Sequence, residues 1–99
     1  MPKSTKREKV LEGLRDSINL FLVKNIDRLG FCHVEEIDLA EDLKSAKVFV
    51  GFVEPQNSRK LIKYINMNIS GIFDEYNKRY SSKNFPSIKV FSFDDELNI

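Results

Sequence analysis

The sequence predicts an α+β fold with a three-stranded sheet and two helical regions. Apolar residues recur at helical spacing in an N-terminal and in a central segment, and they alternate in three shorter segments. A length of 99 residues fits one domain with one core, so residues 1–99 are expected to form a single domain. The expected order is helix, strand, strand, helix, helix, strand, with the two central helices replaced by one if they do not separate.

The first helix is expected from about Ser4 to Val23. Its apolar residues fall within an arc of about 120° on a helical wheel, which is typical of a helix packed on one side. These residues are Val10, Leu11, Leu14, Ile18, Phe21 and Leu22. Residues 25–30 are expected to form a connection, with Gly30 as a turn residue.

Two strands are expected next. Between Phe31 and Leu39 the alternation of apolar residues changes phase, and a β-bulge near Glu35 and Glu36 would restore one buried face. After a polar turn at residues 40–45, four alternating residues form the inward face of the second strand: Ala46, Val48, Val50 and Phe52. The two strands should pair as an antiparallel hairpin.

The second helical region has the strongest pattern. Asn57 or Ser58 is expected to cap its start. An unbroken helix over residues 58–82 would be about 37 Å long, longer than the diameter of about 30 Å expected for a compact domain of this size. Ser/Gly pairs are a known cause of kinks, so a bend is predicted at Ser70 and Gly71. Eight apolar residues keep one helical phase through this region: Leu61, Ile62, Ile65, Ile69, Ile72, Phe73, Tyr76 and Tyr80.

A third strand is expected over residues 87–93, where Ile88 and Val90 alternate with more exposed positions. Three aromatic residues have the opposite parity to the proposed core: Phe49, Phe91 and Phe93. On the outer face of the sheet they could stack on bases, as aromatic residues do in some RNA-binding proteins. Packing at the sheet edge or burial under the first helix is the favoured alternative.

Composition excludes several classes of protein. Cys32 is the only cysteine and His33 the only histidine, so we expect neither disulfides nor Cys/His metal motifs. We expect a cytoplasmic location. No apolar run suggests a secretion signal or a membrane span. His33 and Glu35 share a strand face and could form an acid/base pair, but no nucleophile or phosphate-binding loop accompanies them, so we do not expect an enzyme.

Charge is polarised along the chain. The net charge is only +1, yet residues 1–30 and 55–91 carry +3 and +5, whereas residues 31–54 and 92–99 carry −4 and −3. If the two basic segments share a surface, an anionic partner could bind there. Solvated helix faces are the alternative interpretation of the same charges.

The stretch LGFCHVEEIDLAEDLKSAKVFVGF, at residues 29–52, resembles the central hairpin of the ribosome-binding factor A family. Lys9-Val10 resembles the start of the family, Ser70-Gly71 its interhelical kink, and residues 85–95 its last strand and end. The resemblance covers nearly the whole chain, although Ile69 stands where the family usually has a small residue. It implies a type II KH-like domain, with helices on one face of a three-stranded sheet and a helix-kink-helix in place of the usual GxxG loop.

The resemblance also implies a function. Family members bind the small (30S) ribosomal subunit, contact 16S ribosomal RNA, and assist late maturation, including processing of its 5′ end. It implies no catalysis, cofactor, metal, membrane or small-molecule substrate, and a monomer is expected. A KH-like module for another RNA, and a protein-interaction domain that uses the acidic hairpin from Glu35 to Asp42, remain alternatives.

Candidate RNA-binding residues follow from the predicted bend. There Gly71 would expose backbone that a phosphate could approach, the next helix would present its N-terminus, and lysines would add Coulombic attraction. The alternative is that Ser70-Gly71 only lets a long helix wrap its core. Candidates near the bend are Lys63, Ser70, Gly71 and Lys78. The resemblance implies secondary candidates near element ends, where family members meet RNA: Lys24, Arg28, Arg79 and Lys83.

Overall fold

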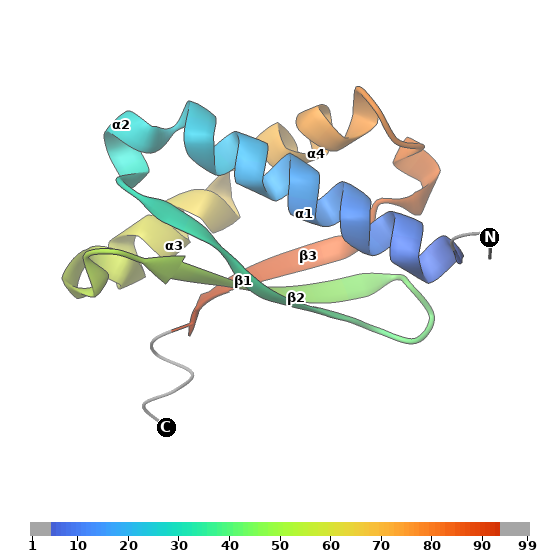
Figure 1. Ribbon diagram of the computed structural model, residues 1–99, viewed down its shortest axis with the longest axis horizontal. Helices are drawn as coiled ribbons and strands as arrows, with labels where there is room; N and C mark the ends of the chain where they lie inside the picture. The colour runs from blue at the N-terminus through green and yellow to red at the C-terminus, as the bar shows by residue number, and fades with distance from the viewer. Residues whose placement is uncertain (1–4, 94–99) are drawn as a thin grey trace.

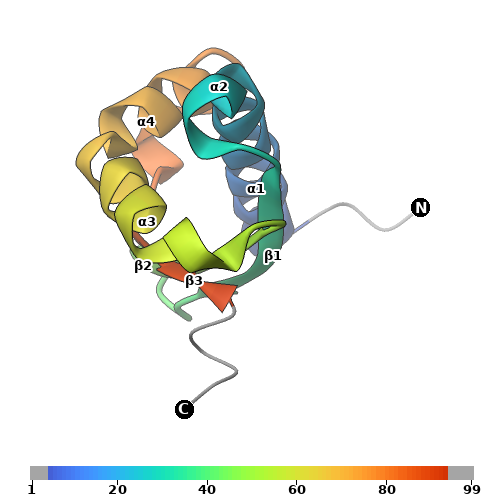
Figure 2. The same cartoon turned by 90° about the vertical axis from the view of Figure 1, so that its left-hand side faces the viewer.

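Helices cover one face of a three-stranded mixed sheet in the computed structural model, which describes residues 5–93 (Figures 1 and 2). The sheet order is β1-β2-β3; β1 and β2 are antiparallel, and β2 and β3 are parallel. The predicted α+β class and element order are confirmed. The elements are α1 Lys6–Lys24, α2 Ile26–Leu29, β1 Cys32–Leu39, β2 Ser45–Phe52, α3 Ser58–Met67, α4 Ile69–Asn77 and β3 Ser87–Ser92, with 3-10 turns at Pro55–Asn57 and Ser82–Asn84.

The bulge in β1 lies where the sequence predicts it. Val34 pairs with Val50 and Glu36 pairs with Phe49, so Glu35 is the extra residue. The bulge keeps Val34 and Leu39 on the buried face despite the change of phase between them. The prediction of an antiparallel hairpin with a bulge near Glu35 and Glu36 is therefore confirmed.

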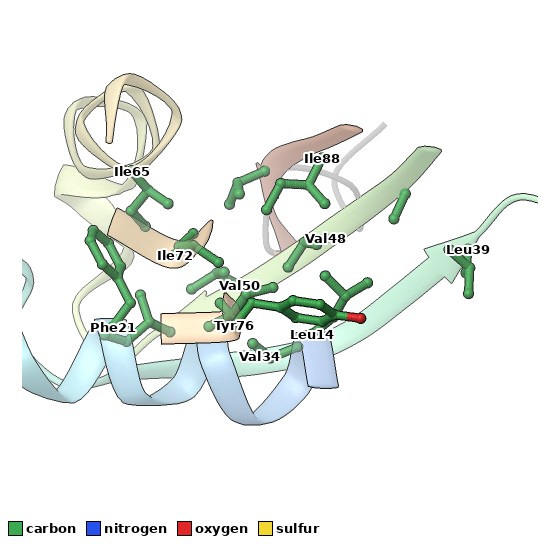
Figure 3. Packing of buried hydrophobic residues seen from close by; sticks show 14 of the residues in the cluster. Leu14, Phe21, Val34, Leu39, Val48, Val50, Ile65, Ile72, Tyr76 and Ile88 are labelled. Carbon is green, nitrogen blue, oxygen red and sulfur yellow. The ribbon is translucent and has the colours of Figure 1, made fainter. Parts of the chain in front are cut away.

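The core lies between the sheet and the helical layer (Figure 3). The first helix begins at Lys6, where the Thr5 hydroxyl accepts a hydrogen bond from the Glu8 N–H at 3.1 Å. Burial of the core side chains stabilises the fold by about 1.5–3 kcal/mol for each large aliphatic residue. The most deeply buried aliphatic residues come from every layer: Leu14, Ile18, Val48, Val50, Ile65 and Ile72.

The central helical region breaks earlier than predicted. Helix α3 ends at Met67 and α4 begins at Ile69, so the break is at Asn68 and the predicted bend at Ser70-Gly71 is wrong. The Asn68 side-chain amide donates to the Tyr64 carbonyl at 2.8 Å. This carbonyl lies in the last turn of α3, where carbonyls have no N–H partner within the helix. Asparagine competes with helical backbone bonding in this way, which explains why it marks the break.

Other boundaries also differ. The connection at residues 25–30 contains the one-turn helix α2, which the sequence pattern does not predict, and Gly30 closes it with a φ of 71°. Helix α4 ends at Asn77 rather than at residue 82. Asn57 occupies the N-cap position of α3 as expected, but its side chain makes no capping hydrogen bond. The expected helix start at Ser4 and the family-like end at residues 94 and 95 lie outside the described residues.

Glycines set the distance between α1 and α4. A Cβ at Gly71 would lie 2.8 Å from the Phe21 ring, and a Cβ at Gly13 would lie 2.7 Å from the Tyr76 ring. The Phe21 ring of α1 thus packs on the α4 backbone at Gly71, and the Tyr76 ring of α4 packs on the α1 backbone at Gly13. Gly71 is needed for close packing inside the helical layer, not for a kink.

The two edges of the sheet are each contacted by an asparagine from a helix. The Asn66 side chain of α3 accepts from the Val90 N–H and donates to the Val90 carbonyl, both at 2.9 Å. On the other edge, the Asn19 side chain accepts from the Val34 N–H at 3.2 Å, beside the bulge. These bonds occupy main-chain groups that an edge strand otherwise leaves open to another chain.

Replacing Asn66 with alanine is expected to reduce the free energy of unfolding by about 1–3 kcal/mol, because both main-chain groups of Val90 lose their partner. Urea unfolding followed by circular dichroism measures the change. Asn77→Ala, at an exposed position of α4, is the matched control and should change stability by less than about 0.5 kcal/mol. Equal effects of the two substitutions would contradict the role of Asn66.

The outer face of the sheet carries an aromatic pair. The rings of Phe49 and Phe91 stack with centroids 5.6 Å apart, on neighbouring strands that point these residues away from the core. Phe49 is nonetheless buried. Of the two favoured interpretations, burial under the first helix is therefore wrong for this pair, whereas packing at the sheet edge agrees with the position of Phe91 on the edge strand β3.

Candidate nucleic-acid interface

The helical layer is basic and the hairpin is acidic. The helical segments at residues 5–30 and 55–86 carry twelve Lys/Arg and six Asp/Glu, whereas residues 31–54 carry two Lys/Arg and six Asp/Glu. The fold places both helical segments on the same side of the sheet (Figure 2). The basic segments that are separate in sequence therefore share one surface, which we call the helical face: the solvent side of α1 to α4.

One basic cluster lies where α2 meets α3. The Arg28 guanidinium lies 4.6 Å from the centre of the Tyr64 ring, and the Tyr64 hydroxyl donates to the Asn25 side chain at 3.2 Å. This stacking orients the guanidinium. Arg28 and Lys60 line a groove of about 370 Å³, beside the exposed side chain of Phe31, and the acidic residues Asp27 and Glu54 line the same groove.

Glu75 ties two of the candidate lysines together. Its Oε1 atom accepts from Lys24 Nζ at 2.6 Å and from Lys78 Nζ at 3.2 Å, which links α1 to the end of α4. The hydrogen bond from Lys24 lowers the pKa of the Glu75 carboxyl, against the raising effect of desolvation, and Lys78 adds to the lowering. One buried negative charge therefore offsets part of the positive charge of Lys24 and Lys78.

This ion pair is expected to add to stability only above acidic pH. Because the pKa is lower in the folded protein, the contribution is present above the ordinary carboxyl pKa and is lost as the pH falls through the lowered value. The difference in unfolding free energy between the wild type and Glu75→Gln should therefore be larger at neutral pH than at a pH well below the ordinary carboxyl pKa. Urea unfolding at both pH values measures it, and a difference that does not change with pH would contradict this role.

The residues of the predicted bend do not form the open backbone that was expected. Gly71 faces Phe21, and its N–H already donates to the Asn68 carbonyl at 2.9 Å. The prediction that a phosphate approaches Gly71 through bare backbone is therefore wrong in its geometry. Ser70 and Lys63 are exposed, as expected.

A second basic cluster lies at the other end of the helical layer. Arg79 follows α4 and lines a hollow together with Lys6 and Lys9 of α1, and Lys83 lies in the following 3-10 turn. The eight candidates thus do not form one site. Arg28 and Lys63 lie on α2 and α3, Ser70 and Gly71 lie at the start of α4, and Arg79 and Lys83 follow its end, while Glu75 joins Lys24 to Lys78.

Sequence reasoning missed several residues of the helical face. Lys6 and Lys9 come next to Arg79 only through the packing of α1 on α4, which no local pattern reveals. Glu75 offered a weak signal, because it is one of two acidic residues in a basic segment and has Lys78 three positions later. Tyr64 lies outside the apolar phase of α3, and it supports Arg28.

Among the residues that the structure describes, the remaining polar side chains do not form a catalytic constellation. His33 and Glu35 contact each other on the outer face of the sheet, and burial raises the pKa of the Cys32 thiol to about 11, which makes it a poor nucleophile. Within residues 5–93, no group of His, Cys, Asp and Glu side chains is placed to hold a metal ion. None of the helices described has the length and apolar composition needed to cross a membrane.

These observations define a class: α+β proteins with helices on one face of a three-stranded mixed sheet and a basic helical face. Ribosome-binding factor A of Natranaerobius thermophilus is 32% identical over 95 residues, which are 93% of this chain and 72% of that protein. The chain belongs to the ribosome-binding factor A family. The protein of that name from Thermodesulfovibrio yellowstonii is 29% identical over 98 residues, covering 97% of this chain and 80% of its own length.

A solved structure agrees with the fold. The crystal structure of ribosome-binding factor A from Thermus thermophilus matches with a TM-score of 0.73, over 91% of this chain and 97% of that chain, at 16% sequence identity. No protein-family model matches the sequence.

Proposed function

We propose that this protein is a non-enzymatic assembly factor of the small ribosomal subunit, which binds 16S ribosomal RNA in immature 30S particles. The observation that carries the proposal is the shared basic helical face in a chain whose relatives are named for ribosome binding. Phosphate neutralisation by lysine and arginine supplies most sequence-independent affinity for RNA. The protein then acts as a cytoplasmic monomer of one domain and needs no cofactor.

The candidate residues would contribute unequally to RNA binding. Arg28, held by Tyr64, presents its guanidinium in a fixed orientation, which suits bidentate contact with phosphate. Lys63 and Ser70 extend this contact surface past the break at Asn68. Lys24 and Lys78 contribute less, because Glu75 already neutralises part of their charge.

Assembly would follow from differential binding. A protein that binds one conformation of the RNA more tightly than another shifts the population toward the first. The factor would hold an immature conformation of the small subunit, permit late maturation and processing of the 5′ end, and dissociate when the mature form disfavours it.

Co-sedimentation with immature small subunits tests the proposal. We expect the protein to sediment with precursor 30S particles in preference to bulk RNA, with an affinity that falls steeply as salt rises. Nuclease treatment should abolish this capture. Capture that survives nuclease would favour the protein-interaction alternative through the acidic hairpin, and equal binding to bulk RNA would favour a KH-like module for another RNA.

A further inference from the structure

The hollow at the N-terminal end of α1 is lined by three cationic side chains. Lys6 and Lys9 lie on one side of it, and Arg79 lies on the other, after the end of α4. Its volume is about 450 Å³. The other residues that line it are Val10, Tyr76, Tyr80, Ser81 and Asn84, so no acidic side chain of the described residues takes part.

These cations differ from those held by Glu75. In the described part of the chain, no carboxylate lies within 4.0 Å of the charged groups of Lys6, Lys9 or Arg79, whereas Lys24 and Lys78 share one. Two carboxylates act on Tyr80, which lines the hollow: Asp16 accepts a hydrogen bond from its hydroxyl at 2.8 Å, and the charges of Asp16 and Glu12 also raise its pKa. The positive charge at the hollow is therefore available to an external anion.

The concave shape adds to the effect of charge. Cations on opposite walls attract the same anion from two sides, and the Arg79 guanidinium offers paired donors for phosphate oxygens. Ser81 and Asn84 add uncharged polar groups to the lining of the hollow. A phosphate group fits this combination of charge and polar contacts better than a nucleobase does, because the aromatic residues lining the hollow, Tyr76 and Tyr80, pack against each other.

We propose that this hollow binds backbone phosphates of the RNA, as a contact separate from the one around Arg28. The inference rests on the proposed function. Lys6 and Lys24 lie at opposite ends of α1, about 27 Å apart at 1.5 Å per residue, so the two contacts bracket the helical face. RNA bound at both would run along α1 and α4 on the side away from the sheet (Figure 1).

The test compares two triple variants of the full chain. Lys6→Gln, Lys9→Gln and Arg79→Gln together remove the charge of the hollow. Lys44→Gln, Lys47→Gln and Lys89→Gln remove the same charge from the hairpin and β3, at positions that are also exposed. The probes are a short mixed-sequence single-stranded RNA, sodium triphosphate, and immature small subunits, with backbone amide resonances followed by NMR in the first two titrations.

RNA and triphosphate should shift the amide resonances of residues 6–9 and 79–84. The hollow variant should bind RNA about tenfold more weakly and with a salt slope shallower by about 2, whereas the control variant should bind like the wild type. Wild-type affinity in the hollow variant would overturn the inference and leave the proposed function standing. Failure of small subunits to bind, with RNA still shifting these resonances, would reject the proposed function and keep the hollow as a phosphate site.

Two further outcomes would also overturn the inference. A poly-glutamate peptide is titrated as a fourth probe, and if it shifts these resonances when RNA does not, the hollow would be assigned to an acidic protein partner. Resonances that stay in place in every titration would show that the three cations are only solvated surface charges.

Discussion

Replacing Gly71 with valine is expected to destabilise the protein by about 2–3 kcal/mol, although valine is the better helix former of the two. The added atoms would enter the space of the Phe21 ring, which lies 2.8 Å from an ideal Cβ at this position and is itself buried. A loss of this size would lower the Tm by about 10–20 °C in a domain of this length. Thermal and urea unfolding measure it.

Ser70→Val is the matched control, because it places the same side chain one position earlier, at an exposed site of the same helix. It should change stability by no more than about 0.5 kcal/mol. Shortening the opposing ring with Phe21→Leu should make the combined loss smaller than the sum of the two single losses. If Gly71→Val were as mild as Ser70→Val, the close contact of α1 with α4 would be contradicted.

Charge reversal on the helical face should have the largest effect on binding. The triple variant Arg28→Glu, Lys60→Glu and Lys63→Glu is expected to lose at least about a hundredfold in affinity for immature small subunits at moderate salt. Each lost phosphate contact should also make the salt dependence shallower by about 0.7–0.9 per contact. Sedimentation over a salt series measures both quantities.

The control for this experiment reverses three lysines elsewhere, with the same change in net charge. Lys44→Glu, Lys47→Glu and Lys89→Glu alter the hairpin and β3, and should leave affinity within a few-fold of the wild type. Circular dichroism establishes that both variants fold. Equal losses in the two variants would mean that net charge, rather than the helical face, governs binding.

Local patterns were sufficient for the strands. The change of phase between Val34 and Ile37 predicted the bulge, and the alternation through β2 and β3 predicted the residues that face the core, although Phe49 on the opposite face is also buried. Each of these predictions depends on neighbours along the chain. The parallel pairing of β2 with β3 does not depend on neighbours along the chain, because it is set by how the intervening helices cross the sheet.

The break in the helical region shows where local reasoning fails. Gly71 weakens a helix in isolation, so local reasoning predicts a bend there. The structure gives a different reason for a glycine at this position: the Phe21 ring of α1, 50 residues away in sequence, occupies the space of a Cβ. The break itself depends on a side-chain bond of Asn68 that competes with the backbone. Neither contact has a signature in hydrophobic periodicity.

The sequence predicted a basic surface, but it predicted only some of the residues that form it. Charge along the chain indicated a basic surface, and the fold brings the two basic helical segments together. Which lysines are available depends on partners that the sequence does not reveal, as Glu75 shows for Lys24 and Lys78. The pairing of Lys6 and Lys9 with Arg79 likewise exists only after α1 has packed on α4.

A crosslinking map on immature small subunits tests the central claim most directly. Photoreactive groups placed singly at exposed positions of the helical face and of the outer sheet face would report which surface meets RNA. We expect crosslinks to 16S ribosomal RNA from the positions in α1 to α4, and few from the hairpin. Crosslinks absent from small-subunit RNA, or confined to the sheet face, would contradict the proposal that this basic helical face binds the immature subunit.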